Sequence, residues 1–500
     1  MIGALVLAAV VAVVPARVNA AGTIYVDSAA GNDSAGDGSL ANPYLTFHKA
    51  YTVAAAGDTI NLAGTFTWTD AGETGDVAGS GYVLNKNLTI VGQSTATTIV
   101  QAASTRGAAD RMVFYVGANV TVGFRDLTIR YGKVTGEKQG GGITLAGAYC
   151  GSGRCPTITG TATLDRVAVT MNDAATAAAN TMYRAGGIYM QEASTITITN
   201  SSITSNTCTC YAYSAGGIAG GEQSQSITME GSLVANNSAT STAGATWPYS
   251  YLAVAGALAV QRFGFLVAKN STFYGNSTDH YAGGLNINYP SQANLTNVTV
   301  VNNSAARGAG GILWTTSYNG AGNYLYLKNS VLANNTGISG AADDIYAYDS
   351  MSANEVTASY SVVEAQTGTS INFAGTGMLT GQQASLDLAS GLAANNALSG
   401  VESLAIGVSS VLRDAGNSTA HGSPNAVTPA SIDQRGSGRV GTYDIGAFEY
   451  NGVANVVDAN SANPVLSSST PADNAANVVE TANIALTFSE PMVPVTGKYV

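Results

Sequence analysis

The chain has 500 residues, enough for one long repetitive domain or for several globular ones. Charged residues make up only 10% of it, well below the usual quarter, whereas glycine occurs 59 times. The formal net charge of -11 arises from 20 basic and 31 acidic residues, and the basic residues form no cluster. This balance argues against a nucleic-acid partner and leaves Ser, Thr and Asn to form the polar surface.

The N-terminus has the pattern of a secretory signal peptide. An apolar run from Ile2 to Val14 is followed by small residues that end at Ala20. The run is too short for a transmembrane helix, which needs about 20 apolar residues, and no later run is long enough. We therefore expect residues 1–20 to be cleaved and the mature protein to be extracellular or on the cell surface.

Residues 21–84 contain a candidate cap for the fold that follows. The i, i+3, i+4 and i+7 positions of one helical face are apolar: Phe47, Ala50, Tyr51 and Ala54. We interpret this segment as a short helix ended by Gly57, with the first strands around it.

A glycine-rich loop before this helix carries hard oxygen ligands. They are Asp27, Asn32, Asp33 and Asp37. Such side chains suit Ca²⁺, but their spacing differs from that of an EF-hand, and ordinary Asx turns explain the same composition. Both interpretations stay open, and the sequence indicates no other cofactor.

Between residues 85 and 370 one pattern recurs at intervals of roughly 30 residues. The aligned segments are VGFRDLTIRYG, ATLDRVAVTMN, ITITNSSITSN, ITMEGSLVANN, LVAKNSTFYGN, ANLTNVTVVNN and LYLKNSVLANN. Each alternates apolar and polar residues, as a half-buried strand does. The last position forms an Asn column: Asn172, Asn206, Asn237, Asn276, Asn303 and Asn335.

This pattern predicts a parallel coil in which each unit forms one turn, about 4.8 Å from the last. Identical positions then stack, and stacked Asn amides can bond one another and the backbone. Glycine pairs follow at each bend, as at Gly186-Gly187 and Gly283-Gly284, where we expect positive φ or close backbone approach.

Four cysteines lie in two short loops. Because an exported chain meets oxidising conditions, disulfides are favoured over a zinc site. We expect a bridge between Cys150 and Cys155. A bond between Cys208 and Cys210 closes a very tight ring, so bonds between the two loops stay open as an alternative.

The pairing of glycine corners with an apolar-x-x-Asn step, as in FYGN at Phe273 to Asn276, resembles known repeat proteins. It is similar to the GGA[I/L]/FxxN repeats of chlamydial-type polymorphic outer-membrane proteins and related adhesins. The resemblance implies an all-β fold, a right-handed parallel β-helix (solenoid) over residues 85–370.

Residues 371–450 include ASIDQRGSGRVGTYDIGAFEY, which closely resembles the closing motif of choice-of-anchor Q proteins. Those are exported bacterial proteins attached to the surface by differing C-terminal devices. We expect Asp433, Arg435, Asp444 and Glu449 to pair internally and hold this closing segment.

A polar linker at residues 451–463 precedes a segment, residues 464–500, that resembles the first strands of a bacterial Ig-like domain. Such a sandwich needs roughly 100 residues, so we expect an incomplete domain here. The expected surface attachment would then follow Val500.

An outward column of the repeats contains charged residues: Arg125, Asp165, Thr199, Glu230, Lys269, Thr296 and Lys328. Asp165 and Glu230 lie two turns apart, roughly 9.6 Å, near the carboxylate separation of inverting glycosidases. Lys269 could instead serve as the base of a lyase. Cross-strand pairs of opposite charge are the structural interpretation, which we prefer.

Aromatic residues precede the glycine corners on four successive turns. They are Tyr183, Tyr211, Tyr213, Trp247, Tyr249, Tyr251 and Tyr281. An exposed ridge of such rings would suit stacking on sugars, whereas rings packed on their own loops would only shield the sheet.

These patterns favour an exported, non-catalytic surface protein that binds a polysaccharide or a host or neighbour-cell surface, as an adhesin does. The first alternative is an extracellular polysaccharide lyase or glycoside hydrolase of the β-helix type. The second alternative is a purely structural surface stalk, because fold alone does not decide function.

Overall fold

The computed structural model describes residues 22–452 and the strands at 466–470 and 485–488. Within the first range it leaves out residues 74–75, 78–80, 137–138, 148–158, 176–182, 222–224, 242–253, 289–290, 316–323, 339–342, 349–355, 369–372, 374, 381–384, 398 and 420–427. The chain forms two compact units, Met1–Ala454 and Asn455–Val500. The expected signal peptide and the Cys150–Cys155 bridge lie outside the described residues.

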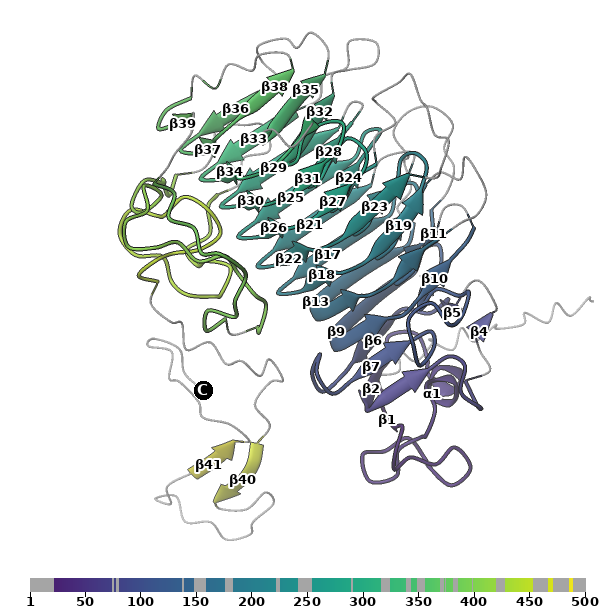
Figure 1. The fold of residues 1–500 in the computed structure, drawn as a ribbon. Coiled ribbons are helices and arrows are strands. Elements are labelled where there is room, and N and C mark those ends of the chain that lie inside the picture. Colours follow the sequence, from purple (N-terminus) through teal and green to yellow (C-terminus); the bar gives the residue numbers. More distant parts are fainter. Residues whose placement is uncertain are drawn as a thin grey trace, which may run out of the picture. The chain divides into compact units, whose positions relative to one another are not determined.

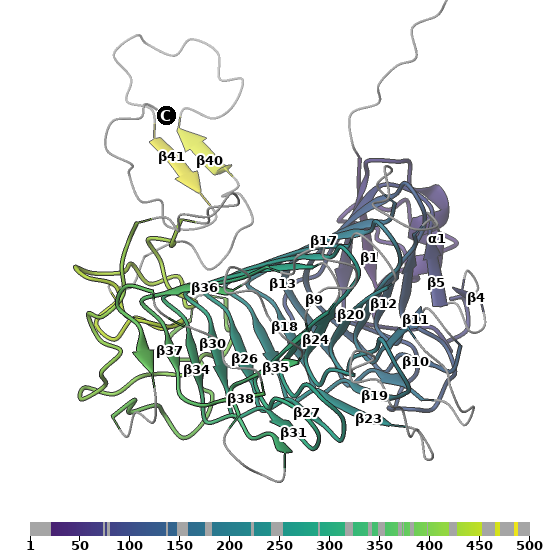
Figure 2. The same ribbon diagram turned by 90° about the horizontal axis from the view of Figure 1, so that it is seen from above.

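The first unit is a parallel β-helix whose turns add strands to four stacked rows (Figures 1 and 2). Row 1 contains β1 (Thr23–Asp27), β2 (Thr59–Ala63), β6 (Leu88–Val91), β9 (Thr121–Arg130), β13 (Thr161–Thr170), β17 (Thr195–Thr199), β21 (Ser226–Glu230), β25 (Phe265–Lys269), β29 (Gln292–Thr296), β33 (Tyr324–Lys328) and β36 (Val356–Ser359). Row 2 contains β3 (Thr65–Thr67), β7 (Ile99–Gln101), the second halves of β9 and β13, β18 (Ser202–Thr204), β22 (Leu233–Ala235), β26 (Thr272–Tyr274), β30 (Thr299–Val301), β34 (Val331–Ala333), β37 (Val362–Val363) and β39 (Leu379–Thr380).

The other two rows complete each turn. Row 3 contains β10 (Lys133–Val134), β14 (Asp173–Ala174), β19 (Thr207–Cys210), β23 (Ser238–Ser241), β27 (Ser277–Thr278) and β31 (Ser304–Ala305). The short pair β11 (Gln139–Gly140) and β15 (Arg184–Ala185) precedes row 4. Row 4 contains β4 (Asp76–Val77), β5 (Gly81–Leu84), β8 (Phe114–Val116), β12 (Ile143–Leu145), β16 (Ile188–Met190), β20 (Ile218–Gly220), β24 (Leu258–Val260), β28 (Leu285–Ile287), β32 (Ile312–Thr315), β35 (Ile345–Tyr348) and β38 (Gln366–Gly368). Apart from the antiparallel β4–β5 pair, these rows are parallel.

The interior is filled by the apolar half of each alternating strand. In row 2, Val169, Ile203 and Val234 stand in register on successive turns, and all three are fully buried. One continuous core runs from the first turn to the last in this way. The predicted parallel β-helix is therefore confirmed.

Helix α1 (Phe47–Val53) covers the N-terminal end of this core, with Phe47 and Ala50 fully buried. Its face is the predicted one, although it ends at Val53 rather than at Gly57. Glu73, which the sequence analysis did not single out, accepts hydrogen bonds from the Phe47 and His48 amides, both at 2.9 Å. Burial raises the pKa of Glu73 to about 7.

Two corners of each turn need left-handed backbone. Between rows 1 and 2 the positive-φ residues are Asp126, Arg166, Asn200, Gly231, Asn270, Asn297, Asn329 and Tyr360. Between rows 2 and 3 they are Tyr131, Met171, Ser205, Asn236, Gly275, Asn302 and Asn334. Asn tolerates this conformation better than other side chains, which explains the first Asn of each NN pair.

The glycine pairs serve close approach and not positive φ. A Cβ on Gly187 would lie 2.6 Å from the carbonyl oxygen of Gly217 on the next turn, and one on Gly284 would lie 2.5 Å from that of Gly311. Neither glycine is among the positive-φ residues. The close stacking of the turns at this corner favours very small residues, and Ala257 takes the place of the second glycine on one turn.

The Asn column forms a continuous buried ladder. The Nδ2 of Asn206 donates to Oδ1 of Asn237 at 2.9 Å, and the same bond joins each neighbouring pair from Asn172 to Asn335. At the last rung Asn335 donates to Oδ1 of Asp344 at 2.7 Å. The pKa of Asp344 is raised to about 6 because its carboxyl is buried.

The closing segment packs against the flank of the coil, on the outward face of row 2 (Figure 1). A second core joins Ile445 and Phe448 of this segment to Val331 of β34. The amide of Ala447 also donates to Thr299 Oγ1 at 3.0 Å. Apolar residues that point outward in row 2 explain this placement, because they need a cover of their own.

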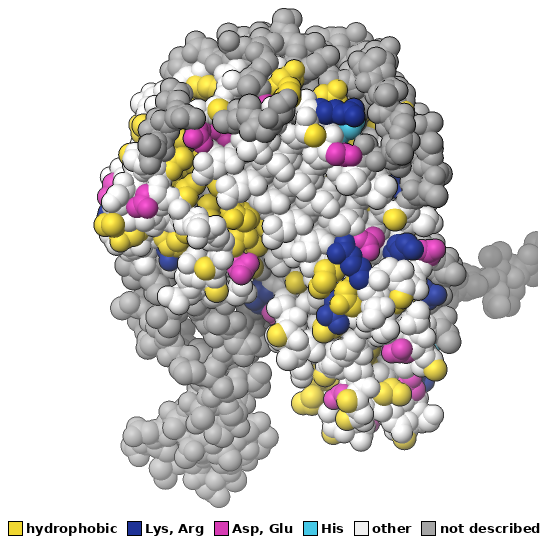
Figure 3. Space-filling model, viewed as in Figure 1, with side chains coloured by type: hydrophobic (Ala, Val, Ile, Leu, Met, Phe, Trp, Pro, Cys, Tyr) yellow, Lys and Arg dark blue, Asp and Glu magenta, His cyan; other side chains and the backbone are white. Residues whose placement is uncertain are grey.

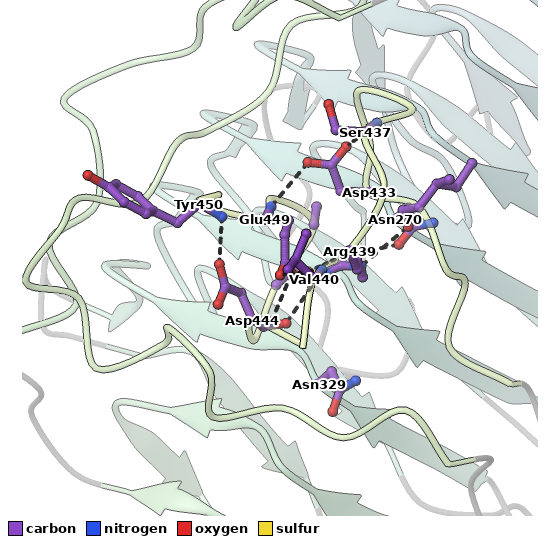
Figure 4. A network of polar contacts seen from close by, with 12 residues as sticks. Asn270, Asn329, Asp433, Ser437, Arg439, Val440, Asp444, Glu449 and Tyr450 are labelled. Carbon is purple, nitrogen blue, oxygen red and sulfur yellow. Dashed lines mark hydrogen bonds and ion pairs between the residues drawn. The ribbon is translucent and has the colours of Figure 1, made fainter. Parts of the chain in front are cut away.

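A buried charge network holds the closing segment together (Figure 4). Arg435 pairs with Asp433 at 2.6 Å, whereas Glu449 pairs with Arg439 at 3.1 Å. The Arg439 side chain is fully buried and also donates to Asn270 of the coil at 3.2 Å. Asp444 accepts the Tyr450 amide at 2.6 Å. The four expected residues therefore act together with Arg439, which the sequence analysis omitted.

The second unit contains an antiparallel pair, β40 (Leu466–Thr470) and β41 (Ala485–Phe488). Cys208 and Cys210 of β19 are joined in a disulfide, so they form no bond with the other cysteine loop. In the part of the chain described, no helix has the length and apolar character that a membrane crossing requires.

Candidate functional site

A polar groove of about 290 Å³ lies between row 2 of the early turns and one loop of the closing segment. It is lined by Thr95, Arg166, Val167, Asn200, Ser202, Thr204, Leu233, Ser399, Gly400, Val401 and Glu402. Figure 3 shows the recess beside the closing segment, above the N-terminal turns. Residues distant in the sequence thus form one site within the first unit.

Outward-pointing hydroxyl groups form the floor of the groove. In β18 the side chain of Ile203 points into the core, so its neighbours Ser202 and Thr204 point outward. The Thr204 hydroxyl donates to that of Thr170, in register on the preceding turn, at 3.1 Å. The floor therefore offers hydroxyl groups at the spacing of stacked strands.

A guanidinium group lies at the corner between rows 1 and 2. Arg166 donates from Nε to Asp126 at 2.6 Å and from Nη1 to Asp165 at 2.8 Å. Burial alone would lower the pKa of Arg166, but the hydrogen bonds and charges of these two carboxylates raise it. The residue has a φ of 53°, so its backbone adopts the left-handed conformation shared by this corner.

The opposite wall comes from the closing segment. Gln434 fixes this wall to the coil, because its Nε2 donates to the backbone oxygen of Glu402 at 3.0 Å and to that of Ser232 at 3.3 Å. Val401 is buried against Leu233, whereas the Glu402 side chain is exposed beside the groove. The wall is therefore anchored by one amide and one apolar contact.

The charged column is arranged as the register of the strands predicts. Asp165, Thr199 and Glu230 occupy successive turns, followed by Lys269. Asp165 lies 3.5 Å from Arg125 in addition to its contact with Arg166. Because two guanidinium groups already hold this carboxylate, the geometry favours the structural interpretation over an acid–base pair of Asp165 and Glu230.

Of the two interpretations of the aromatic residues before the glycine corners, the described tyrosines favour packing against the coil over an exposed ridge. Tyr211 and Tyr213 are only 6% and 5% exposed, and burial raises the pKa of Tyr211. Tyr183 stacks on Tyr213 with ring centroids 5.0 Å apart, and Tyr281 packs edge-on against His280. The other three, Trp247, Tyr249 and Tyr251, lie outside the described residues.

The physical reason is an alanine column beside row 4. Ala185, Ala215 and Ala282 are fully buried members of a cluster against which Tyr183 and Tyr281 pack. Small apolar side chains on the outside of the coil require larger ones to exclude water. The described tyrosines thus shield the coil.

The acidic loop near the N-terminus uses its side chains for turns. Asp27 accepts the amides of the residues two and three positions later, and Asn32 does the same. Asp37 accepts the amide of Ser39, and Asp33 accepts those of Leu45 and Thr46. Among the described residues no group of three or more His, Cys, Asp or Glu side chains converges on one point. Asp27, Asn32 and Asp37 thus form Asx turns, whereas Asp33 ties the loop to the residues that begin α1.

Sequence reasoning missed the groove itself. Ser202 and Thr204 had the required signal, since the outward positions of row 2 change from polar to apolar between successive turns. Nothing in the pattern of the closing segment indicated which face it would cover. The contribution of Glu402 therefore depended on the three-dimensional arrangement.

Solved structures that match this chain include two lyases and a lacto-N-biosidase. Pectate lyase Pel9A shares 16% identity, with 86% of this chain and 96% of the enzyme covered and a TM-score of 0.47. A rhamnogalacturonan lyase shares 12% identity, with 78% of this chain and 96% of the lyase covered and a TM-score of 0.35. A GH136 lacto-N-biosidase from Eubacterium ramulus shares 12% identity, with 72% of this chain and 67% of the enzyme covered and a TM-score of 0.25. No curated protein matches the chain in sequence. Residues 460–500 match the model of the bacterial Ig-like domain family, so the end of the chain is similar to such domains.

Proposed function

We propose that this is an exported cell-surface protein that binds glycans without cleaving them, through the groove beside the closing segment. The observation that carries the proposal is the lining of the groove, where hydroxyl, amide, carboxylate and guanidinium groups surround a small open space. The bacterial Ig-like segment supports a location outside the cell. Adhesion to a polysaccharide or to another cell surface is the role that follows.

The chemistry of the lining suits a ligand rich in hydroxyl groups. Ser202 and Thr204 can both donate and accept hydrogen bonds, and Asn200 adds an amide. Arg166 uses three of its five N–H groups on Asp126 and Asp165, which leaves two for a ligand. A sugar presents donors and acceptors in alternation, which this mixed lining can satisfy.

Retention of the full chain on immobilised polysaccharides tests the proposal. The panel would contain xylan, mannan, pectate and alginate. We expect at least one to retain the protein, and the double variant Thr204→Val/Glu402→Ala to lose at least tenfold in affinity. The matched control is Thr163→Val/Asp70→Ala, which removes the same groups from exposed positions outside the groove. Equal binding by the groove variant and the wild type would contradict the assignment of the site.

A lyase or glycoside hydrolase is the second candidate, favoured by one feature. Glu230 and Lys269 stand in register on adjacent turns of row 1, so an acidic and a basic residue occupy neighbouring outward positions. A reducing-end assay on the same panel separates this candidate from binding alone. New ends that disappear in Glu230→Gln or Lys269→Ala would establish catalysis. A protein that neither cleaves nor is retained would be a structural stalk.

A further inference from the structure

The floor of the groove continues toward the N-terminus as a row of outward side chains. Thr204 in the groove is in register with Thr170, Thr170 with Arg130, and Arg130 with Gln101. Thr204 and Thr170 are bonded through their hydroxyls, and Arg130 Nε donates to Gln101 Oε1 at 2.9 Å. Two strand spacings, about 10 Å, separate Thr204 from Arg130. A chain-like ligand could therefore leave the groove along this row.

Tyr131 and Met171 flank the row in an unfavourable backbone conformation. Their φ values are 62° and 54°, in the left-handed region that large side chains rarely adopt. The same corner on later turns is occupied by Ser205, Asn236, Gly275, Asn302 and Asn334. Among the described residues with positive φ at this corner, the two large ones, Tyr131 and Met171, therefore lie beside the outward row that runs from Thr170 to Gln101. Backbone strain of this kind commonly accompanies a function.

The Tyr131 ring lies beside the open row. The guanidinium carbon of Arg130 is 4.5 Å from the centroid of this ring. Tyr131 and Met171 are both half-buried, so each side chain keeps some exposed surface. Figure 3 shows basic and hydrophobic side chains gathered over the N-terminal turns, next to a broad uncharged face. Because this guanidinium covers one face of the ring, a sugar ring would stack on the opposite face.

We propose that the groove is one end of an extended binding track whose other end is Tyr131. The ligand is then a glycan chain that lies across successive turns, with its first sugar on Thr204 and a later sugar on the Tyr131 ring. This inference rests on the proposed function, because it extends the same groove. If the track exists, the affinity rises with the number of sugars in the glycan, and Tyr131 is responsible for this rise.

The test compares Tyr131→Asn with the wild type, using oligosaccharides of one to six sugars prepared from the polysaccharide that retains the full chain. Asn fits the left-handed conformation that Asn236 and Asn302 adopt at the same corner. We therefore expect a melting temperature equal to or above that of the wild type. The longer oligosaccharides should bind about threefold to tenfold more weakly, whereas a single sugar should bind as before.

Tyr360→Asn is the matched control. Tyr360 also has a positive φ, 48°, but lies at the other corner on a late turn, beside Lys328. This variant should bind oligosaccharides of every length as the wild type does. If Tyr131→Asn also shows unchanged length dependence while Thr204→Val/Glu402→Ala loses binding, the track is wrong and the groove stands. If no polysaccharide retains the wild type, the proposed function and the track are both wrong.

Discussion

The outward faces of row 2 differ between the early and the late turns of the same coil. In the open half, from β7 to β18, this face is polar, with Thr170, Ser202 and Thr204 among its residues. In the covered half, from β22 to β37, the outward positions include Leu233, Val301 and Val331, each at most 2% exposed. In both halves the apolar inward residues alternate with outward residues in the same way. The inward pattern therefore specifies the coil, and the outward pattern specifies what binds beside it.

The energetic contrast is large enough to position the closing segment. Burial of a Val or Leu side chain stabilises by about 1.5–3 kcal/mol, and several such residues lie together in the covered half. Hydroxyl groups in the open half form hydrogen bonds with water, so leaving them exposed costs little free energy. The closing segment consequently covers the late turns, and its edge beside the early turns forms the groove.

The largest expected effect comes from removing the cation that holds the covered half together. Arg439→Met leaves Glu449 buried without its ion pair, and Asn270 without a donor. Loss of one partner of a buried pair costs about 3–5 kcal/mol. Denaturant unfolding should show this loss, and limited proteolysis should cut the closing segment first.

Arg106→Met supplies the control from the open half. Arg106 pairs with Asp173 at 2.6 Å, but its side chain is 36% exposed. An exposed ion pair contributes about 0–1 kcal/mol. A similar loss of stability in both variants would mean that the network of the closing segment adds nothing specific.

A matched pair of substitutions examines the two outward faces directly. Val331→Asp places a carboxylate between β34 and the closing segment, where Ile445 and Phe448 exclude water. We expect about 3 kcal/mol of destabilisation. Thr170→Asp places the same group on the open face and should change the unfolding free energy by about 0.5 kcal/mol or less. Urea titrations measure both, and equal costs would refute the distinction between the halves.

The sequence predicts the interior of this fold well because the interior repeats. Stacked turns place equivalent residues on top of one another, so a column in the alignment is also a column in space. The alternation around Ile203 and the position of Asn206 followed from this rule. The sequence also located the glycine corners, but the reason for glycine there is the close approach between turns, as at Gly187, which depends on how the turns stack.

The flank was less predictable, because contacts there join residues that no repeat relates. Gln434 reaches Ser232 across about 200 positions of sequence, and Arg439 reaches Asn270 in the same way. The candidate groove therefore could be found only once the closing segment was placed.

The open and covered halves differ on their outward faces, but the buried Asn ladder is the same in both. We therefore expect substitutions in the ladder to have equal effects in the two halves. Asn206 lies in the open half and Asn303 in the covered half, yet each is fully buried and bonded to both neighbouring rungs. Replacement by Ala leaves buried amide groups unpaired and should cost about 2 kcal/mol at either site. Denaturant unfolding of both single variants measures these costs. A markedly larger cost at Asn303 would show that the closing segment also stabilises the interior.

The smallest expected effect concerns pH and the end of the ladder in the covered half. Burial raises the pKa of Asp344 to about 6, whereas an unfolded Asp titrates near 3.9. Between these values the folded protein holds a proton that the unfolded chain has lost, so stability falls as pH rises. Asp344 should account for about 1 kcal/mol of loss between pH 5 and pH 7. Asp344→Asn keeps an oxygen acceptor for Asn335 but cannot ionise, so its urea midpoint should fall less over this interval. If the urea midpoints of the variant and the wild type depend on pH in the same way, other carboxyl groups cause the loss. Glu73 would then be examined first, because burial raises its pKa to about 7.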